Sequence, residues 1–171
     1  THVHNRIDPA DDISIINTEL ILSDLEIVTK RLEKVAKEGR NDKQAAAEVP
    51  VLDRFRGALE QGTLLSRIDF NEDEKAITKS LNLLTAKPFI YIINVSEDQL
   101  SAGWQPDEKL LAAMEGSQYV VLCNRLELEV SEMAPEEKTK FLAELGLPES
   151  GLDRVIKTAY ETLGLLSFLT T

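Results

Sequence analysis

The residues best suited to chemistry are Asn94 and Glu97, which follow the apolar stretch 88–93. An asparagine side chain both donates and accepts hydrogen bonds, whereas an ionised carboxylate only accepts them. Placed three residues apart at the end of a predicted strand, the two side chains are suited to reading the edge of a nucleobase. Only two of the four positions in this pattern are fixed, so a plain polar turn after a strand is the alternative interpretation.

The acid indicates which base is favoured. In the GTPase motif Asn-Lys-x-Asp, the aspartate accepts hydrogen bonds from N1 and N2 of guanine. Here Glu97 is one methylene longer, and Val95 replaces the lysine. Adenine has an acceptor at N1 and no exocyclic N2, so the pattern weakens the selection of guanine and makes adenine plausible. We expect Asn94 and the backbone of Val95 to contact the base.

A second polar segment follows the apolar residues YVVL. It consists of Cys123 and Asn124, at the end of another predicted strand. The carboxyl ends of parallel strands line the crevice in which α/β folds bind ligands. Backbone amide groups at this point can close over a base. The alternative is that Cys123 is a small buried hydrophobic residue. It is the single cysteine of the chain, so it forms no intramolecular disulfide.

Two patterns that phosphate chemistry requires do not occur in the sequence, the phosphate loop GxxxxGK[ST] and a DxxG-type metal loop. We therefore expect no catalytic residue and no metal ligand in this chain. His2 and His4 are the two histidines, and they are predicted to be solvated rather than to bind a metal.

The net charge of the chain limits the kinds of partner that it is expected to bind. The formal net charge of −11 repels DNA and anionic membranes, and no apolar run approaches the ~20 residues of a membrane span. We therefore expect neither partner. One local group of basic residues is the exception, and it is either a solvated helix face or a docking patch for RNA phosphates. Its members are Lys30, Arg31, Lys34, Lys37 and Arg40.

The elements that position these residues fall into two regions. Residues 11–86 predict helices, with Asp11 or Asp12 capping the first, and with Pro50 kinking or restarting the second. An apolar row with alternating spacings of four and three predicts that the first two helices form a hairpin. The row consists of Ile21, Leu25, Val28, Leu32 and Val35.

A third helix is predicted after Asn71, which forms a capping box with Glu74 and precedes a buried face of Ile77, Leu81 and Leu84. Residues 87–165 then alternate strands with helices, which predicts a parallel sheet. In this region, Ser150 and Asp153 form the second predicted capping box. The final segment, LLSFLTT, is a candidate for a further strand.

Three stretches, in order and with appropriate spacing, resemble the YchF-type Obg-like ATPases: THVHNRIDPADDISIINTELILSDLE, LLTAKPFIYIINVSED and EEKTKFLAELGLPESGLDRVIKTAYETLGLLSF. The resemblance implies an α/β fold with an all-α insertion. A helical coiled-coil hairpin over 11–86 would join the C-terminal part of a P-loop NTPase α/β domain over 87–165. Residues 1–10 would link to the missing N-terminal part of that domain, and 166–171 would begin the junction to a missing TGS domain.

The same resemblance implies the function. Asn94, Val95 and Glu97 match base-contacting positions, and Cys123 and Asn124 fall on the second base-side loop. The parent is implied to be a cytoplasmic ATPase and GTPase that prefers ATP, uses Mg²⁺ with ATP or GTP, and associates with the ribosome, through the large subunit. The fragment alone is expected to be inactive and to bind no cofactor.

Two other functions stay open. The helical arm is alternatively a docking module for the ribosome, RNA or protein, or only a structural spacer. The sequence also departs from the family at Pro50, where relatives look like continuous helix, and at LSFLTT, where the family usually has TYFTAG.

Overall fold

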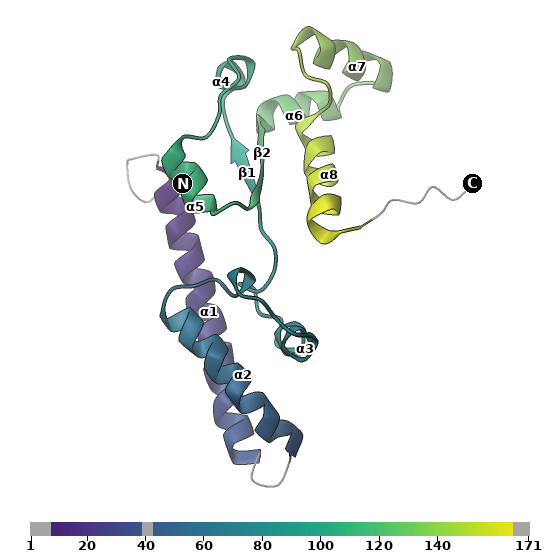
Figure 1. Cartoon of the computed structure of the whole chain (residues 1–171). Helices are drawn as coiled ribbons and strands as arrows, with labels where there is room; N and C mark the ends of the chain where they lie inside the picture. The colour runs from purple at the N-terminus through teal and green to yellow at the C-terminus, as the bar shows by residue number, and fades with distance from the viewer. Residues whose placement is uncertain (1–7, 39–42, 166–171) are drawn as a thin grey trace, which may run out of the picture. The chain divides into compact units, whose positions relative to one another are not determined.

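The computed structural model describes residues 8–38 and 43–165, with the side chains of Glu38 and of 43–45 left aside (Figure 1). The chain forms two compact units, which divide between Pro88 and Phe89. His2, His4, Arg40 and the segment 166–171 lie outside the described residues.

The first helix, α1 (Pro9–Glu38), begins earlier than the sequence predicts. Its cap is Asp8, because the backbone N–H of Asp11 donates to Asp8 Oδ1 at 3.3 Å. A proline suits the first position of a helix, since its missing N–H would have no partner there. Asp11 and Asp12 are therefore not caps but first-turn acids, where their charge suits the helix dipole.

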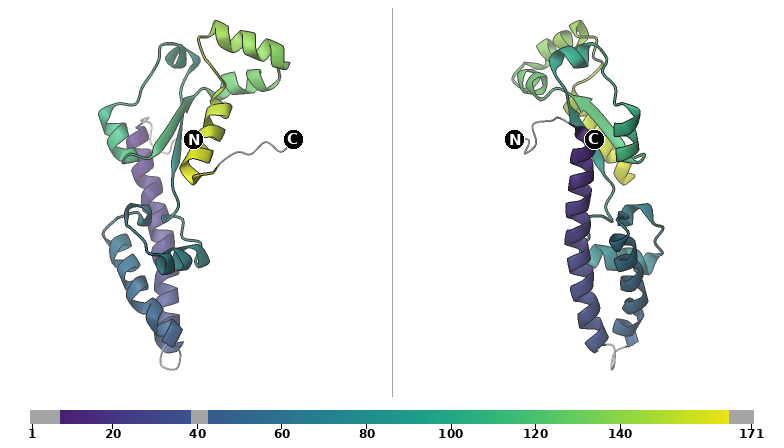
Figure 2. Two further views of the ribbon diagram at one scale, coloured as in Figure 1. Left: turned by 45° about the vertical axis from the view of Figure 1, so that its right-hand side comes forward. Right: turned by 90° about the vertical axis from the view of Figure 1, so that its left-hand side faces the viewer.

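The second helix, α2 (Lys43–Glu60), lies beside α1 and runs in the opposite direction (Figures 1 and 2). It continues through Pro50 as one helix, so the predicted restart at that residue is wrong. Pro50 is exposed, so its ring points away from the packed side. Both helices bury apolar rows, which comprise Ile21, Val28, Leu32 and Val35 in α1 and Leu52, Phe55 and Leu59 in α2.

One position of the α1 row is polar. Asp24 is fully buried, whereas the predicted Leu25 is only half-buried. The Asp24 carboxylate accepts hydrogen bonds from the backbone N–H groups of Leu84 (3.0 Å) and Thr85 (2.7 Å) and from the Thr85 hydroxyl (2.7 Å). These bonds compensate the burial of the charge and fasten the segment 84–85 to α1.

A short 3-10 helix, η1 (Leu65–Arg67), and α3 (Glu72–Ser80) complete the helical unit. The capping box of α3 is confirmed, because Asn71 and Glu74 exchange hydrogen bonds of 2.9 Å. The predicted buried face is wrong, since its three residues are half-buried. Leu83 is buried instead, after the chain turns through Asn82 at a φ of 53°.

The second unit contains a two-stranded parallel sheet of β1 (Ile90–Asn94) and β2 (Gln118–Leu122). The register runs from Ile90 opposite Gln118 to Asn94 opposite Leu122, so both strands end at the same level. The crossover between them contains α4 (Glu97–Ser101) and α5 (Glu108–Met114).

Three helices follow β2, namely α6 (Asn124–Ser131), α7 (Pro135–Glu144) and α8 (Gly151–Leu163). The last two match helices that the sequence predicts over 135–145 and 151–163, whereas α4 and α6 were not predicted. α8 lies against the strands (Figure 1). Ser150 caps α8 as predicted, and Gly164 ends it at a φ of 63°, in the left-handed region that favours glycine.

The start of α8 also depends on α6. The Glu127 carboxylate accepts hydrogen bonds from the backbone N–H groups of Gly151 (2.7 Å) and Leu152 (3.0 Å). An added Cβ at Gly151 would lie 2.6 Å from Leu122 Cβ and 2.8 Å from Glu127 Oε1. The absence of a side chain at Gly151 therefore allows α8 to approach the end of β2.

Candidate functional site

A pocket of about 470 Å³ lies at the carboxyl ends of β1 and β2. It brings together four of the residues predicted to contact a base, because the ends of neighbouring parallel strands meet at one edge of a sheet. The lining residues are Asn94, Val95, Ser96, Glu97, Asp98, Cys123 and Arg125. The fifth predicted residue, Asn124, touches this set through a hydrogen bond to Asn94.

That hydrogen bond defines the orientation of the Asn94 side-chain amide. The backbone N–H of Asn124 donates to Asn94 Oδ1 at 2.9 Å. Because a backbone N–H only donates, the atom that faces it must be the amide oxygen. The Asn94 amino group is therefore the donor that this side chain offers to a ligand, and the Asn124 N–H is already used.

Val95 and Cys123 form the apolar part of the site, with 8% and 4% of their surface exposed. The N–H of Val95 donates to the Leu122 carbonyl at 2.9 Å. Any backbone contact from Val95 to a base must therefore use its carbonyl. Cys123 packs in a cluster with Leu126, Val130 and Leu142, so it does act as a small hydrophobic residue.

The polar turn after β1 has a structural role as well. The Ser96 hydroxyl accepts from the Gln99 N–H (3.2 Å), and Gln99 Oε1 accepts from the Ser96 N–H (3.0 Å), a capping box that starts α4. The pattern Ser-x-x-Gln is the signal of this box in the sequence, and it was not among the predicted capping boxes. Glu97 takes no part in the box, and its exposed side chain lines the pocket.

Two further charged residues were missed at the site, Asp98 and Arg125. Arg125 follows Asn124 in the first turn of α6, and its Nε lies 3.3 Å from Glu129 Oε1. Its signal in the sequence is its position directly after Cys123 and Asn124, the polar segment at the end of the second predicted strand. With Arg125, the pocket has one cationic and two anionic side chains on an apolar floor.

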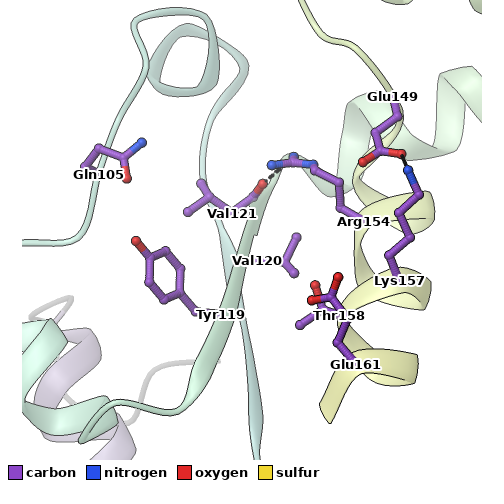
Figure 3. Close-up of a pocket in the computed structure, with 9 residues that line it drawn as sticks. All are labelled: Gln105, Tyr119, Val120, Val121, Glu149, Arg154, Lys157, Thr158 and Glu161. Atoms are coloured by element: carbon purple, nitrogen blue, oxygen red, sulfur yellow. Dashed lines mark hydrogen bonds and ion pairs between the residues drawn. The ribbon is translucent and has the colours of Figure 1, made fainter. Parts of the chain in front are cut away.

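A second pocket, of about 320 Å³, opens along β2 beside α8 (Figure 3). Its cations have structural partners. Arg154 Nη2 donates to the Val121 carbonyl at 2.6 Å, and Lys157 pairs with Glu149. Arg154 thus covers a carbonyl on the side of β2 away from β1, which protects that edge of the strand. No residue predicted to bind a ligand lies here.

The predicted basic cluster is partly neutralised. Lys30 pairs with Glu26, and Arg31 makes a two-pronged contact with Glu48 of α2, the shortest at 2.7 Å. Arg31 therefore has a role in the hairpin itself. Lys34 and Lys37 are exposed.

The described residues lack two other kinds of site. No group of three His, Cys, Asp or Glu side chains over 8–38 and 43–165 is placed to hold a metal ion. None of the helices in these ranges is both long and apolar enough to cross a membrane.

Comparison with solved structures relates this fold to a class of proteins. The chain is similar to the Schizosaccharomyces pombe YchF GTPase, with a TM-score of 0.82 and 29% identity over 95% of this chain and 46% of that one. The fold, mixed helical with a small parallel sheet, is therefore that of part of a GTPase-like structure.

Comparison of the sequence with known proteins gives a more specific relationship. The chain is 42% identical over 175 residues to the ribosome-binding ATPase YchF of Bacillus subtilis and 40% identical over 171 residues to that of Escherichia coli O157:H7. Each match covers 99% of this chain and 48% or 47% of the relative. No family model matches the chain. The chain is thus YchF-type in sequence, and it spans about half the length of the curated relatives it matches.

Proposed function

We propose that this chain supplies the base-binding half of an ATP-preferring YchF-type NTPase. The observation that carries the proposal is the pocket where Asn94, Val95, Glu97 and Cys123 meet. Segments outside this chain would supply the phosphate loop and the Mg²⁺ site, since the sequence has no GxxxxGK[ST] pattern. On this proposal the whole protein hydrolyses ATP in the cytoplasm, and the chain alone is inactive.

The hydrogen bonds at the site support adenine as the preferred base. The Asn94 amino group can donate to purine N7, which adenine and guanine share. They differ at position 6, where adenine has an amino donor and guanine has a carbonyl acceptor. The Asn124 N–H already bonds to Asn94, so it is not a donor for a carbonyl at position 6, whereas the carbonyl of Val95, a residue that lines the pocket, is an acceptor. An amino group at position 6 suits this acceptor better than a carbonyl does.

Calorimetric titration with ATP and GTP in the presence of Mg²⁺ tests the proposal. We expect the full-length protein to bind ATP at least ten-fold more tightly than GTP, and the 171-residue chain to show no micromolar binding of either. Equal affinity of the full-length protein for both would contradict the adenine preference. Micromolar binding by the chain alone would contradict the division of the site.

The second candidate function is docking of the helical arm on a ribosome. Two features favour it: the relatives are named ribosome-binding ATPases, and basic residues lie on α1 toward its C-terminal end. Helix α1 would then provide a patch for RNA phosphates, its charge partly balanced by Glu26. On this proposal the contact is with the large subunit.

A charge-matched pair of triple variants tests the arm. Replacing Lys30, Lys34 and Lys37 by alanine removes three charges but keeps Arg31 and its contact with Glu48. The control replaces three exposed lysines elsewhere in the same unit, Lys75, Lys79 and Lys87. We expect only the first variant to lose co-sedimentation with ribosomes at moderate salt. Equal retention by both variants would exclude docking through α1.

A further inference from the structure

Arg125 stands apart from the other residues at the base pocket. It supplies the cation among the described lining residues, which otherwise comprise carboxylates, small polar groups and apolar side chains. Its backbone position is well determined, because the preceding residue, Asn124, is bonded to Asn94 and begins α6. The backbone that carries its side chain is therefore held in place at the ends of the two strands.

The packing of Arg125 does not explain its presence. Its side chain is 81% exposed, and within the described part of the chain it contacts Glu129 in an i,i+4 pair at 3.3 Å. Exposed pairs of this kind contribute roughly 0.3–0.5 kcal/mol to stability in general, so the side chain is free to reorient at little cost. Because Glu129 holds Nε, the planar end of the guanidinium remains available to a ligand.

The pocket lacks one component that a purine needs. Val95 and Cys123 provide an apolar floor, but none of the described lining residues is aromatic, so no ring is available to cover the second face of a base. A guanidinium is planar and stacks on π-systems, which an ammonium group does less well. Arg125 is the lining residue that has such a plane.

We propose that Arg125 stacks on the purine and forms the outer wall of the base site. This inference rests on the proposed function, since it takes the pocket to be the base site. Stacking contacts the face of a base rather than its edge, so Arg125 strengthens adenine and guanine binding alike. Selection between the two bases stays with Asn94, Val95 and Glu97.

Titrations with uncharged nucleosides isolate this contact, because adenosine and guanosine have no phosphate for a cation to attract. Amide chemical shifts of the isotopically labelled chain, followed by NMR at millimolar nucleoside, give the dissociation constants. We expect Arg125→Ala to weaken both nucleosides by a similar factor, roughly 2- to 30-fold. Arg125→Lys keeps the charge but loses the plane, so it should restore little of the affinity.

The control is Lys140→Ala, which removes an exposed cation from α7 outside the pocket. It should bind both nucleosides as the parent chain does. If the parent chain binds adenosine and Arg125→Ala binds it equally well, the stacking role is wrong and the base site stands. Full rescue by Arg125→Lys would also overturn stacking. If the parent chain binds neither nucleoside, the base site itself is wrong, and the role of Arg125 is wrong with it.

Discussion

At the residue scale, the hydrogen bond from Asn124 N–H to Asn94 Oδ1 is the central contact of the site. It connects the ends of two strands across 30 positions of sequence and leaves the amino group as the part of the Asn94 amide that this bond does not use. On the proposed function, the same bond also occupies a backbone donor that a guanine carbonyl would otherwise use. One contact would then contribute both to the shape of the site and to its preference for adenine.

A pair of substitutions at Asn94 separates these roles. Asn94→Asp keeps an oxygen for the Asn124 N–H but loses the amino donor, whereas Asn94→Ala loses both. We expect both variants to bind adenosine about ten-fold more weakly, because each loses the bond to N7. Only Asn94→Ala should also lose about 1 kcal/mol of folding stability. Urea unfolding and NMR titration measure the two effects, and unchanged adenosine affinity in Asn94→Asp would contradict the role of the donor.

Asp24 is a purely structural counterpart in the helical unit. Asp24→Ala would leave the N–H groups of Leu84 and Thr85 and the Thr85 hydroxyl without their acceptor. We expect a loss of about 3 kcal/mol in the free energy of unfolding, measured by urea titration with circular dichroism. Thr85→Val removes one donor and keeps the acceptor, so it should cost about 1 kcal/mol. If both variants lose the same free energy of unfolding, the Asp24 carboxylate contributes less stability than its three hydrogen bonds predict.

At the scale of elements, the approach of α8 to β2 depends on Gly151. A Cβ there would overlap Leu122 and the Glu127 carboxylate, so we expect Gly151→Ala to destabilise the second unit by roughly 1–3 kcal/mol. Trp104, the single tryptophan, lies in this unit and reports its unfolding by fluorescence.

The matched control is Gly57→Ala inside α2, where the added Cβ has no atom within 4 Å apart from its chain neighbours and the backbone of its own helix. Alanine favours helix more than glycine does, so this variant should gain about 0.5–1 kcal/mol. A gain in both variants would show that α8 does not pack against Leu122 as closely as described.

The start of α3 makes stability depend on pH. The Asn71 backbone N–H, together with the Arg54 guanidinium, lowers the pKa of Glu74 below its ordinary 4.5. Because the folded form has the lower pKa, the stability from Glu74 is fully present above about pH 4.5 and is lost as the pH falls through the lowered value.

We therefore expect Glu74→Gln to be less stable at neutral pH and to lose less stability on acidification than the parent chain. Thermal unfolding followed by circular dichroism between pH 3 and 6 measures this. Glu72→Gln removes a charge from the same turn without removing the capping box, and it controls for charge alone. Parallel pH profiles for Glu74→Gln and the parent would contradict the role of this carboxylate.

Much of this element structure is predictable from local sequence, because caps act within one helical turn. Asn71 and Ser150 mark the starts of α3 and α8 in both sequence and structure. The first helix was predicted to start late because Asp11 and Asp12 look like caps, although the sequence Asp8-Pro9 is the stronger signal. Helix α4 escaped prediction because its five residues form little more than one turn, and α6 escaped it because Leu126, Leu128 and Val130 alternate with glutamates, a pattern typical of a strand.

At the scale of the whole molecule, the sequence predicts the two polar strand ends but not which residues join them. The meeting of Asn94 and Cys123 follows from parallel pairing, which periodicity suggests. The Asn94–Asn124 bond and the burial of Asp24 depend on tertiary register, which no local pattern carries. The relationship to YchF is confirmed for a chain that spans about half of its relatives' length.

The central claim is that the pocket at the ends of β1 and β2 binds adenine. Amide and side-chain NMR signals of the chain, titrated with adenosine and with 7-deazaadenosine, test it most directly. We expect saturable shifts of the Asn94 amino and Asn124 backbone signals with adenosine, and about ten-fold weaker binding of the analogue that lacks N7. Shifts confined to the other pocket, around Tyr119 and Arg154, or equal binding of the two nucleosides, would contradict it.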